Sequence, residues 1–130
     1  MSGEKVPLIQ IVEDSRFMQK MISVIVSKNG WSSTVAVDYP EAMKKFNDRK
    51  PDIVLLDLHL PGKSGLEILK EMKSENDRVE VIVVTGTEDR IEKGKCMEYG
   101  AYAVISKPFT SQYLKSAIDS ALKKTQLFDG

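Results

Sequence analysis

The sequence predicts an α/β domain built on an open, doubly wound parallel sheet with three α/β/α layers. Five short apolar segments alternate with five segments whose apolar residues recur at helical spacing. The third apolar segment, residues 53–56, follows Pro51-Asp52 and is apolar throughout, which is typical of a strand buried on both faces. Five strand–helix units are too few for a barrel, and right-handed crossovers leave a sheet covered on both faces.

The expected strands are apolar and often β-branched. They span residues 8–12, 34–37, 53–56, 79–84 and 103–105. The first helix follows Ser15 and stops at Asn29-Gly30, which suits a positive φ angle. The second begins after Asp38, with Pro40 in its first turn. Each helix therefore has a recognisable start or stop.

The remaining helices have similar signals. The third follows the turn at Pro61-Gly62, Thr87 or Asp89 is placed to cap the fourth, and Thr110 is placed to cap the fifth. The apolar positions of these helices are Leu66, Ile68, Leu69 and Met72 in the third, Ile91, Cys96 and Met97 in the fourth, and Leu114, Ala117, Ile118, Ala121 and Leu122 in the fifth.

Composition restricts the class of protein. The 130 residues suit one domain, residues 1–130 with a core of about 6–127, and 19 basic residues balance 19 acidic ones, so no basic surface for nucleic acid is expected. The single Cys96 excludes an internal disulfide and fits a reducing compartment. The polar start, Met1 to Pro7, does not resemble a signal peptide, and no apolar run is long enough to span a membrane. We therefore expect a soluble, cytoplasmic protein.

Polar residues follow the ends of four predicted strands. They are Glu13-Asp14, Asp57, Thr85-Gly86 and Lys107. Parallel strands place their carboxyl ends at one sheet edge, where ligands bind. The three carboxylates would repel one another unless a cation compensates them, and hard oxygen ligands beside a phosphate suit Mg²⁺. This edge is therefore a candidate site for phosphoryl chemistry.

The other residues of this edge suit the same chemistry. Lys107 offers a compact positive charge to a phosphoryl oxygen or to Asp57, and Lys107-Pro108 is a candidate cis peptide. Thr85 offers a hydroxyl donor, and Gly86 leaves its backbone N–H open to close approach. Each residue also has a plain structural explanation, such as a turn for Asp57 or a β-branched strand end for Thr85. Their convergence favours the functional interpretation.

Together these motifs resemble the receiver domain of two-component response regulators, in particular the free-standing chemotaxis type. The matching segments are Ile9–Asp14, Val54–Gly62, Val83–Gly86, Gly100-Ala101 and Lys107–Thr110. The resemblance covers essentially the whole chain. It implies the flavodoxin-like strand order 2-1-3-4-5.

The resemblance also implies a phosphoacceptor and a metal site. Asp57 would accept a phosphoryl group from a histidine kinase or a histidine phosphotransfer protein. Asp14 and Asp57 would bind Mg²⁺ directly, with Mn²⁺ as an alternative, while Glu13 would act through water and His59 through its backbone carbonyl. Glu13 replaces the commoner aspartate, and His59 is the only histidine.

Further roles concern switching. Thr85, Lys107 and the backbone of Gly86 would bind the phosphoryl oxygens. The face formed by the fourth helix, fifth strand and fifth helix would then shift and bind a downstream protein. Val104 stands where many relatives have an aromatic switch residue, so we expect partial switching. The resemblance implies a monomer or weak dimer that processes only its own phosphoryl group.

Three alternatives remain. A haloacid-dehalogenase-like phosphatase also uses a strand-end aspartate, Mg²⁺ and a lysine, but it requires a second acid two residues later, where this chain has His59. A degenerate receiver would act only as an interaction module, although the full set of acids, threonine and lysine argues against it. The chain could also be a receiver cut from a longer regulator or a hybrid kinase.

Overall fold

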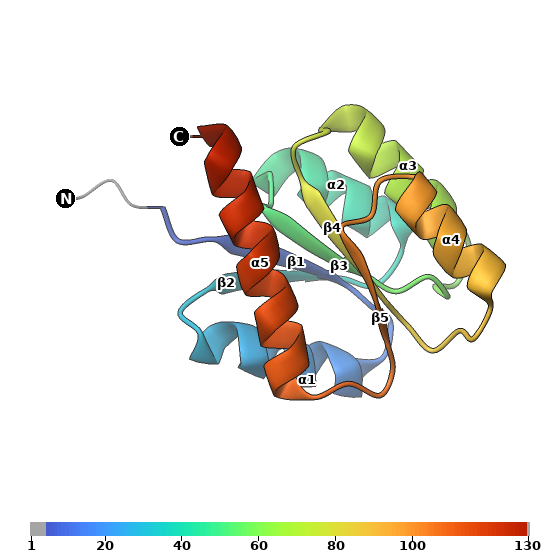
Figure 1. Cartoon of the computed structure of the whole chain (residues 1–130), viewed down its shortest axis with the longest axis horizontal. Coiled ribbons are helices and arrows are strands. Elements are labelled where there is room, and N and C mark those ends of the chain that lie inside the picture. Colours follow the sequence, from blue (N-terminus) through green and yellow to red (C-terminus); the bar gives the residue numbers. More distant parts are fainter. Residues whose placement is uncertain (1–4, 130) are drawn as a thin grey trace.

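The computed structural model describes the backbone of residues 5–129 and the side chains of residues 5–125. Five parallel strands form one sheet in the order β2-β1-β3-β4-β5 (Figure 1). The strands are β1 (Leu8–Val12), β2 (Ser32–Ala36), β3 (Ile53–Leu56), β4 (Glu80–Thr85) and β5 (Ala103–Ser106). The predicted fold class and strand order are confirmed.

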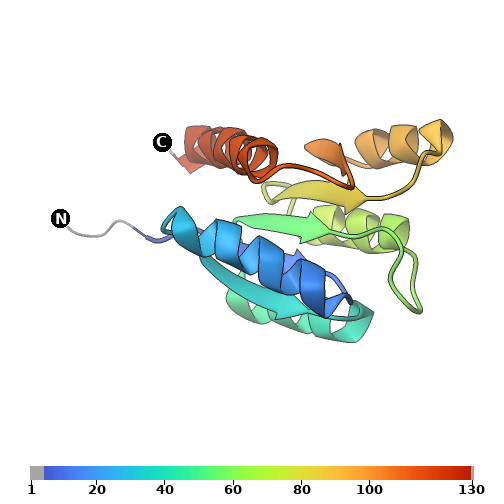
Figure 2. The ribbon, with the colours of Figure 1, turned by 90° about the horizontal axis from the view of Figure 1, so that it is seen from below.

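Helices cover both faces of this sheet. They are α1 (Arg16–Lys28), α2 (Tyr39–Arg49), α3 (Gly65–Glu75), α4 (Arg90–Glu98) and α5 (Ser111–Asp129). One buried cluster joins the sheet to α1 and α5, and a second joins it to α2, α3 and α4. In Figure 2, which is seen from below the view of Figure 1, α1 lies in front of the strands and α2 lies behind them.

β3 divides its side chains between these two clusters. Ile53 and Leu55 pack on the side of α1 and α5, whereas Val54 and Leu56 pack on the side of α2, α3 and α4. All four side chains are buried. This explains why the segment is apolar throughout, and it places Asp57, the next residue, at the centre of the sheet edge.

Side-chain caps set the points where the helices begin. The hydroxyl of Ser15 accepts the N–H of Met18 at the start of α1, and the hydroxyl of Thr110 accepts the N–H of Tyr113 in α5. Asp89 caps α4, so the choice between Thr87 and Asp89 is resolved in favour of Asp89.

The structure shifts β4 by one residue, to Glu80–Thr85, and extends β5 by one residue, to Ser106. Two further predictions about elements are wrong in detail. The second strand covers residues 32–36 instead of 34–37, because Ser32 pairs with Leu8 in an edge strand where exposed polar residues are tolerated. At its other end, the N–H of Val37 donates to the carboxylate of Glu41 and leaves the ladder. β2 therefore begins two residues earlier and ends one residue earlier than predicted, and its first residues are serines.

The predicted apolar stripe of α4 is also wrong. Cys96 is buried, but Ile91 is 73% exposed and Met97 is 51% exposed. The helix has only nine residues, and Cys96 is the one that is buried. Across residues 5–129, the structure contains no helix with the length and apolar character required to cross a membrane.

Candidate functional site

The backbone ladder extends one residue beyond several strands and thereby positions the candidate residues. The N–H of Asp57 donates to Val12 at 3.0 Å, and the N–H of Lys107 donates to Thr85 at 2.8 Å. The N–H of Glu13 donates in the same way to the carbonyl of Ala36 in β2. Residues far apart in the sequence are thus fixed side by side at the carboxyl edge of the sheet.

Three carboxylates converge at this edge. Glu13, Asp14 and Asp57 each offer an oxygen within 4.8 Å of the others. Glu13 is 3% exposed and Asp57 is 7% exposed, whereas Asp14 is exposed. Like charges this close repel strongly when water is partly excluded. The donor set consists of hard oxygens with one open side, which fits Mg²⁺.

Lys107 supplies the positive charge within this cluster. Its Nζ lies 3.0 Å from Oε1 of Glu13 and 3.6 Å from Oδ2 of Asp57. The predicted approach to Asp57 is present, but the shorter contact, to Glu13, was not anticipated. The Lys107–Pro108 peptide bond, which the sequence offered as a candidate cis bond, is cis.

Glu13 is held by contacts with the first turn of α1. Its Oε2 accepts the N–H of Ser15 at 3.0 Å, and its backbone carbonyl accepts the side-chain amide of Gln19 at 2.6 Å. Gln19 was not identified from the sequence. The sequence feature that could have identified Gln19 is a polar residue one turn after the Ser15 cap, on the side of α1 that faces Glu13 and Asp14. These bonds leave Oε1 of Glu13 directed at Lys107.

The two oxygens of Asp57 have different surroundings. Oδ1 accepts the N–H of His59 at 3.1 Å, and Oδ2 faces Lys107. The imidazole of His59 is not part of the acidic cluster, since its Nε2 lies 3.5 Å from Oε1 of Glu92 in the first turn of α4. Glu92 was also missed from the sequence, because only folding brings α4 beside the loop after β3.

Gly65 is a further residue that sequence reasoning missed. A Cβ at this position would lie 2.8 Å from the carbonyl oxygen of Leu58 and 3.0 Å from that of Asp57, and would overlap the Cα of Leu58. The N–H of Gly65 also donates to the Leu58 carbonyl at 3.1 Å. The start of α3 therefore packs directly on the backbone of the Asp57 loop, which only glycine permits.

The remaining predicted residues lie beside the cluster. Thr85 is fully buried, and its hydroxyl accepts the N–H of Thr87 at 3.3 Å. A Cβ at Gly86 would meet no atom within 4 Å, so the backbone there is open on that side. Val104 is partly buried and packs against the cluster under α2, α3 and α4.

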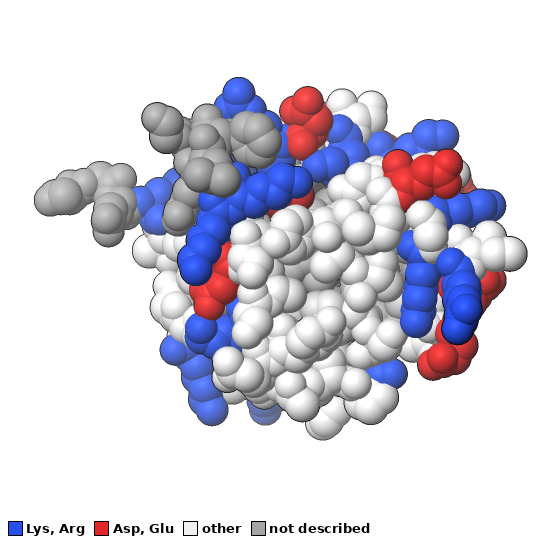
Figure 3. All heavy atoms as spheres, viewed as in Figure 1, with Lys and Arg blue, Asp and Glu red and all other residues white. Residues whose placement is uncertain are grey.

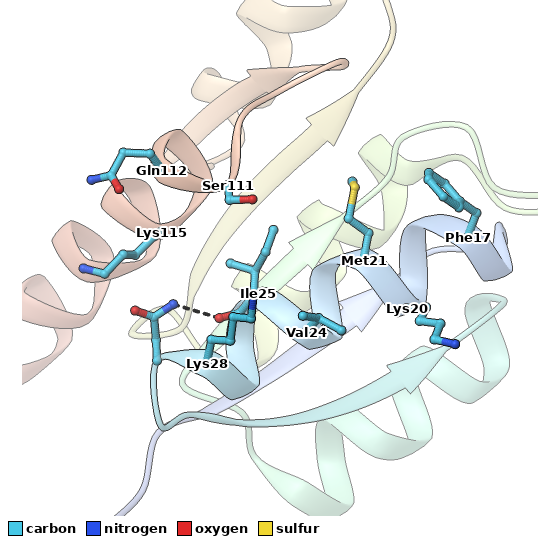
Figure 4. Close-up of a pocket in the computed structure, with 10 residues that line it drawn as sticks. Phe17, Lys20, Met21, Val24, Ile25, Lys28, Ser111, Gln112 and Lys115 are labelled. Carbon is cyan, nitrogen blue, oxygen red and sulfur yellow. Dashed lines mark hydrogen bonds between the residues drawn. The ribbon is translucent and has the colours of Figure 1, made fainter.

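A groove lies between α1 and α5, and none of the three acids lines it. It has a volume of about 390 Å³ and is lined by residues that include Phe17, Met21, Ile25, Lys28 and Lys115. Met21 and Ile25 point from α1 into the space between the two helices (Figure 4). Phe17 is 75% exposed, which is unusual for a large aromatic side chain. The groove therefore combines an apolar floor with basic side chains.

Comparisons with known proteins agree with this architecture. The family model described as response regulator receiver domain matches residues 9–119. The sensory transduction protein RegX3 of Mycobacterium tuberculosis is 34% identical over 116 residues, covering 89% of this chain and 51% of RegX3. The phosphate regulon transcriptional regulatory protein PhoB of Escherichia coli is 30% identical over 118 residues, covering 89% of this chain and 52% of PhoB.

The solved structures are also similar. The receiver domain of NtrX from Brucella abortus has a TM-score of 0.85 at 30% identity, covering 88% of this chain and 98% of that one. A CheY-like receiver domain from Methanospirillum hungatei has a TM-score of 0.92 at 24% identity, covering 97% and 100%, and shows the fold alone. The chain spans about half the length of the curated relatives described above, and their names do not support the chemotaxis type.

Proposed function

Because this chain belongs to the response regulator receiver domain family, we propose that Asp57 accepts a phosphoryl group from a phosphohistidine donor. The observation that carries the proposal is the convergence of Asp57 with Glu13, Asp14 and Lys107 at one sheet edge. Phosphoryl transfer depends mainly on positioning and charge neutralisation. A carboxylate held by the sheet beside an ammonium group provides both.

The transfer step uses an Asp57 oxygen as nucleophile. A lone pair of this oxygen forms the new O–P bond while the P–N bond to the donor imidazole breaks. The imidazole leaves with the electron pair of the broken P–N bond. Lys107, which is 3.6 Å from Oδ2, is placed to stabilise negative charge on the phosphoryl oxygens. Thr85 and the backbone N–H of Gly86 would hold the remaining phosphoryl oxygens.

The acidic cluster would hold one Mg²⁺ ion, or Mn²⁺ in its place. Asp14 and Asp57 would bind the ion directly, Glu13 through water, and His59 through its backbone carbonyl. The ion would neutralise charge on the phosphoryl group. Glu13 already has Lys107 as a close partner at 3.0 Å, which fits an indirect role for its carboxylate.

The phosphodonor would be a histidine kinase or a histidine phosphotransfer protein. We place its docking surface at the groove between α1 and α5, because α1 begins two residues after Asp14 and α5 begins four residues after Lys107. The apolar floor fits an apolar helix face, and Lys28 and Lys115 favour an acidic flank on the donor. Lys28→Glu should slow transfer from such a donor and leave labelling by acetyl phosphate unchanged. Equal transfer rates for both proteins would place docking elsewhere.

The output surface would be the face formed by α4, β5 and α5. A broad area without charged side chains lies over β5, between α5 and α4 (Figure 3). The exposed apolar side chains of the two helices include Ile91, Met97 and Tyr113. Such a surface suits a downstream protein partner, or a second copy in a weak dimer, better than direct contact with nucleic acid. A receiver that works within a longer regulator would use the same face.

We also propose that switching is partial. Val104 is an aliphatic residue, partly buried against the core, so the side chain at this position has no ring that could change rotamer. To move the protein from 1:99 to 99:1 between two conformations, a ligand must bind the favoured conformation about 5.5 kcal/mol more tightly than the other. NMR spectra of the phosphorylated protein should therefore show α4 resonances between two end states. Complete displacement without a partner would contradict partial switching.

The phosphatase alternative is weaker. It requires a second carboxylic acid two residues after the nucleophile, and the side chain there is the imidazole of His59, which faces Glu92. We therefore propose that the protein turns over only its own phosphoryl group. Hydrolysis of an external phosphate ester that is lost in Asp57→Asn would favour the phosphatase instead.

The central test is chemical labelling. The protein is incubated with acetyl phosphate and Mg²⁺ and analysed by mass spectrometry, beside Asp57→Asn and the control Asp48→Asn. Asp48 is exposed on α2 and pairs with Lys44. We expect one phosphoryl adduct in the wild type and the control and none in Asp57→Asn. An equal adduct in all three proteins would remove Asp57 from its proposed role.

A further inference from the structure

The loop after β3, residues 57–64, is fixed more firmly at its base than at its tip. At the base, the N–H of Asp57 donates to β1, and the N–H of Gly65 donates to the carbonyl of Leu58. The tip, residues 61–64, is mostly exposed. Among the hydrogen bonds of the described residues, none is donated by a backbone N–H of residues 60–64. The tip therefore depends on side-chain contacts.

Lys63 supplies contacts of this kind. Its Nζ lies 4.1 Å from the centre of the Tyr39 ring and 3.4 Å from Oε1 of Glu71. Tyr39 is the first residue of α2 and Glu71 lies in α3, so one ammonium group joins the tip to both helices. The side chains of Lys63 and Glu71 are each 32% exposed, so water and salt screen their contact only in part.

Tyr39 and Glu71 are also bound to each other. The phenol O–H of Tyr39 donates to the carboxylate of Glu71, with Oη 2.8 Å from Oε1 and 3.0 Å from Oε2. A hydrogen bond to an ionised acceptor is stronger than one between neutral groups. This bond joins α2 to α3 on one face of the sheet (Figure 1). Lys63 therefore rests on two side chains that already hold each other in place.

We infer that Tyr39, Lys63 and Glu71, which we call the tip cluster, position the loop after β3 for binding of the metal ion beside Asp57. The inference rests on the proposed function of Asp57. The members of the tip cluster are positioning residues, because they act through the backbone of the loop. Gly65 fixes the base of the same loop by close packing, whereas the tip cluster fixes its other end.

The loop conformation matters because one proposed metal ligand lies in it. The carbonyl of His59 is only four residues before Lys63 in the chain. A ligand that requires one conformation binds with an apparent affinity reduced in proportion to the fraction of molecules that adopt it. Loss of the tip cluster should lower this fraction and weaken Mg²⁺ binding. Once Mg²⁺ is saturating, the transfer step should be nearly unchanged, because Lys107 is held on another loop.

The test uses the full chain and a matched lysine–tyrosine pair as control. Lys63→Met removes the ammonium group, Lys63→Arg keeps a cation, and Tyr39→Phe removes only the hydroxyl. The controls are Lys70→Met and Tyr99→Phe, because Nζ of Lys70 lies 5.4 Å from the Tyr99 ring centre and this pair links α3 to the end of α4 without touching the loop.

Three quantities are measured for each protein. Hydrogen exchange over residues 58–65 in metal-free buffer reports how well the loop is held. NMR titration with Mg²⁺ gives the Kd of the ion without any phosphodonor. The rate of labelling by acetyl phosphate, followed as a function of Mg²⁺ concentration, separates an effect on metal binding from an effect on the transfer step.

Lys63→Met should speed exchange over residues 58–65 and raise the Kd for Mg²⁺, each by about two- to fivefold. Tyr39→Phe should change both in the same direction, Lys63→Arg should restore values near those of the wild type, and both controls should match the wild type. Labelling at saturating Mg²⁺ should stay within about twofold of the wild-type rate. This combination would support a positioning role for the tip cluster.

Several outcomes would overturn the inference. Faster exchange in Lys63→Met with an unchanged Kd for Mg²⁺ would show that the tip cluster is merely structural. Unchanged exchange in that variant, or equal changes in Lys70→Met, would show that the contact does not hold the loop. A wild type that binds no Mg²⁺ at this edge would also overturn it. If the wild type binds Mg²⁺ but forms no adduct, the proposed function fails, and the exchange and Kd values still decide the inference.

Discussion

Lys107 Nζ lies 3.0 Å from Oε1 of Glu13, although 94 positions separate the two residues in the chain. Glu13 is almost fully buried, and Asp57 and Asp14 lie beside it. The ammonium group therefore offsets repulsion among carboxylates before any ion binds. The same group is the one that we propose stabilises the phosphoryl oxygens, so stability and the proposed function are coupled at this residue.

The first prediction concerns this lysine. Lys107→Gln should lower the free energy of unfolding by about 1–3 kcal/mol in metal-free buffer, because it leaves the buried carboxylate of Glu13 without its ionic partner. Urea unfolding measures the change. The control is Lys115→Gln, which breaks a half-exposed pair with Asp119 and should change stability by less than about 0.5 kcal/mol. Equal losses in both variants would show that Lys107 is only a surface charge.

The second prediction concerns magnesium. Asp14→Asn should leave metal-free stability unchanged or slightly higher, because it removes one of three clustered negative charges. It should also weaken Mg²⁺ binding by at least about tenfold, since a charged oxygen ligand is lost. Thermal unfolding with and without Mg²⁺ measures both effects, because a ligand specific to the folded state raises Tm. If the Mg²⁺-dependent shift in Tm survives in Asp14→Asn, the ion binds elsewhere. Asp48→Asn should retain the full shift.

The third prediction compares two glycines. Gly65→Ala should destabilise the protein by about 1–3 kcal/mol and slow labelling of Asp57, because the new methyl group would press on the backbone of Leu58 and Asp57. Gly94→Ala meets no atom within 4 Å and should raise stability by about 0.5–1 kcal/mol. Urea unfolding and acetyl phosphate labelling measure the two effects. A tolerated Gly65→Ala variant with normal labelling would show that the α3 contact does not position the acceptor loop.

The fourth prediction concerns pH. Burial raises the pKa of the Cys96 thiol above its ordinary value of 9.0, and the carboxylate of Glu92 adds to this effect. The folded state therefore holds the thiol proton more tightly than the unfolded state. This contribution to stability is fully present below pH 9.0 and is lost as the pH rises above it.

Cys96→Ala tests this sign. The variant should be less stable overall because it loses packing, but its unfolding free energy should fall less steeply above pH 9.0 than that of the wild type. Burial lowers the pKa of Lys73, so its contribution to the pH dependence of stability has the opposite sign. Lys73 is present in both proteins, so its contribution cancels in the comparison. Denaturant unfolding at several pH values gives the two slopes. Parallel slopes would contradict a raised thiol pKa.

The sequence alone was sufficient for the fold class and for the residues that meet at the sheet edge. Residues 53–56 are apolar on both faces, and each of the other strand segments alternates with a helical pattern, so local periodicity determines the order of elements. Once the strands are parallel, Asp14, Asp57 and Lys107 must lie at the same edge. The stripe predicted for α4 failed because Ile91 and Met97 satisfy helical spacing without being covered by another element.

The tertiary structure decided which of these groups touch one another. The pairing of Lys107 with Glu13, the approach of His59 to Glu92 and the packing of Gly65 on the loop after β3 join residues that sequence spacing does not relate. Such contacts depend on how loops turn and how helices are placed on the sheet, and those placements arise from the balance of all packing interactions together. Amino-acid pattern therefore determined the architecture and the chemistry available at its edge, and three-dimensional packing determined the partners of each charged and polar group.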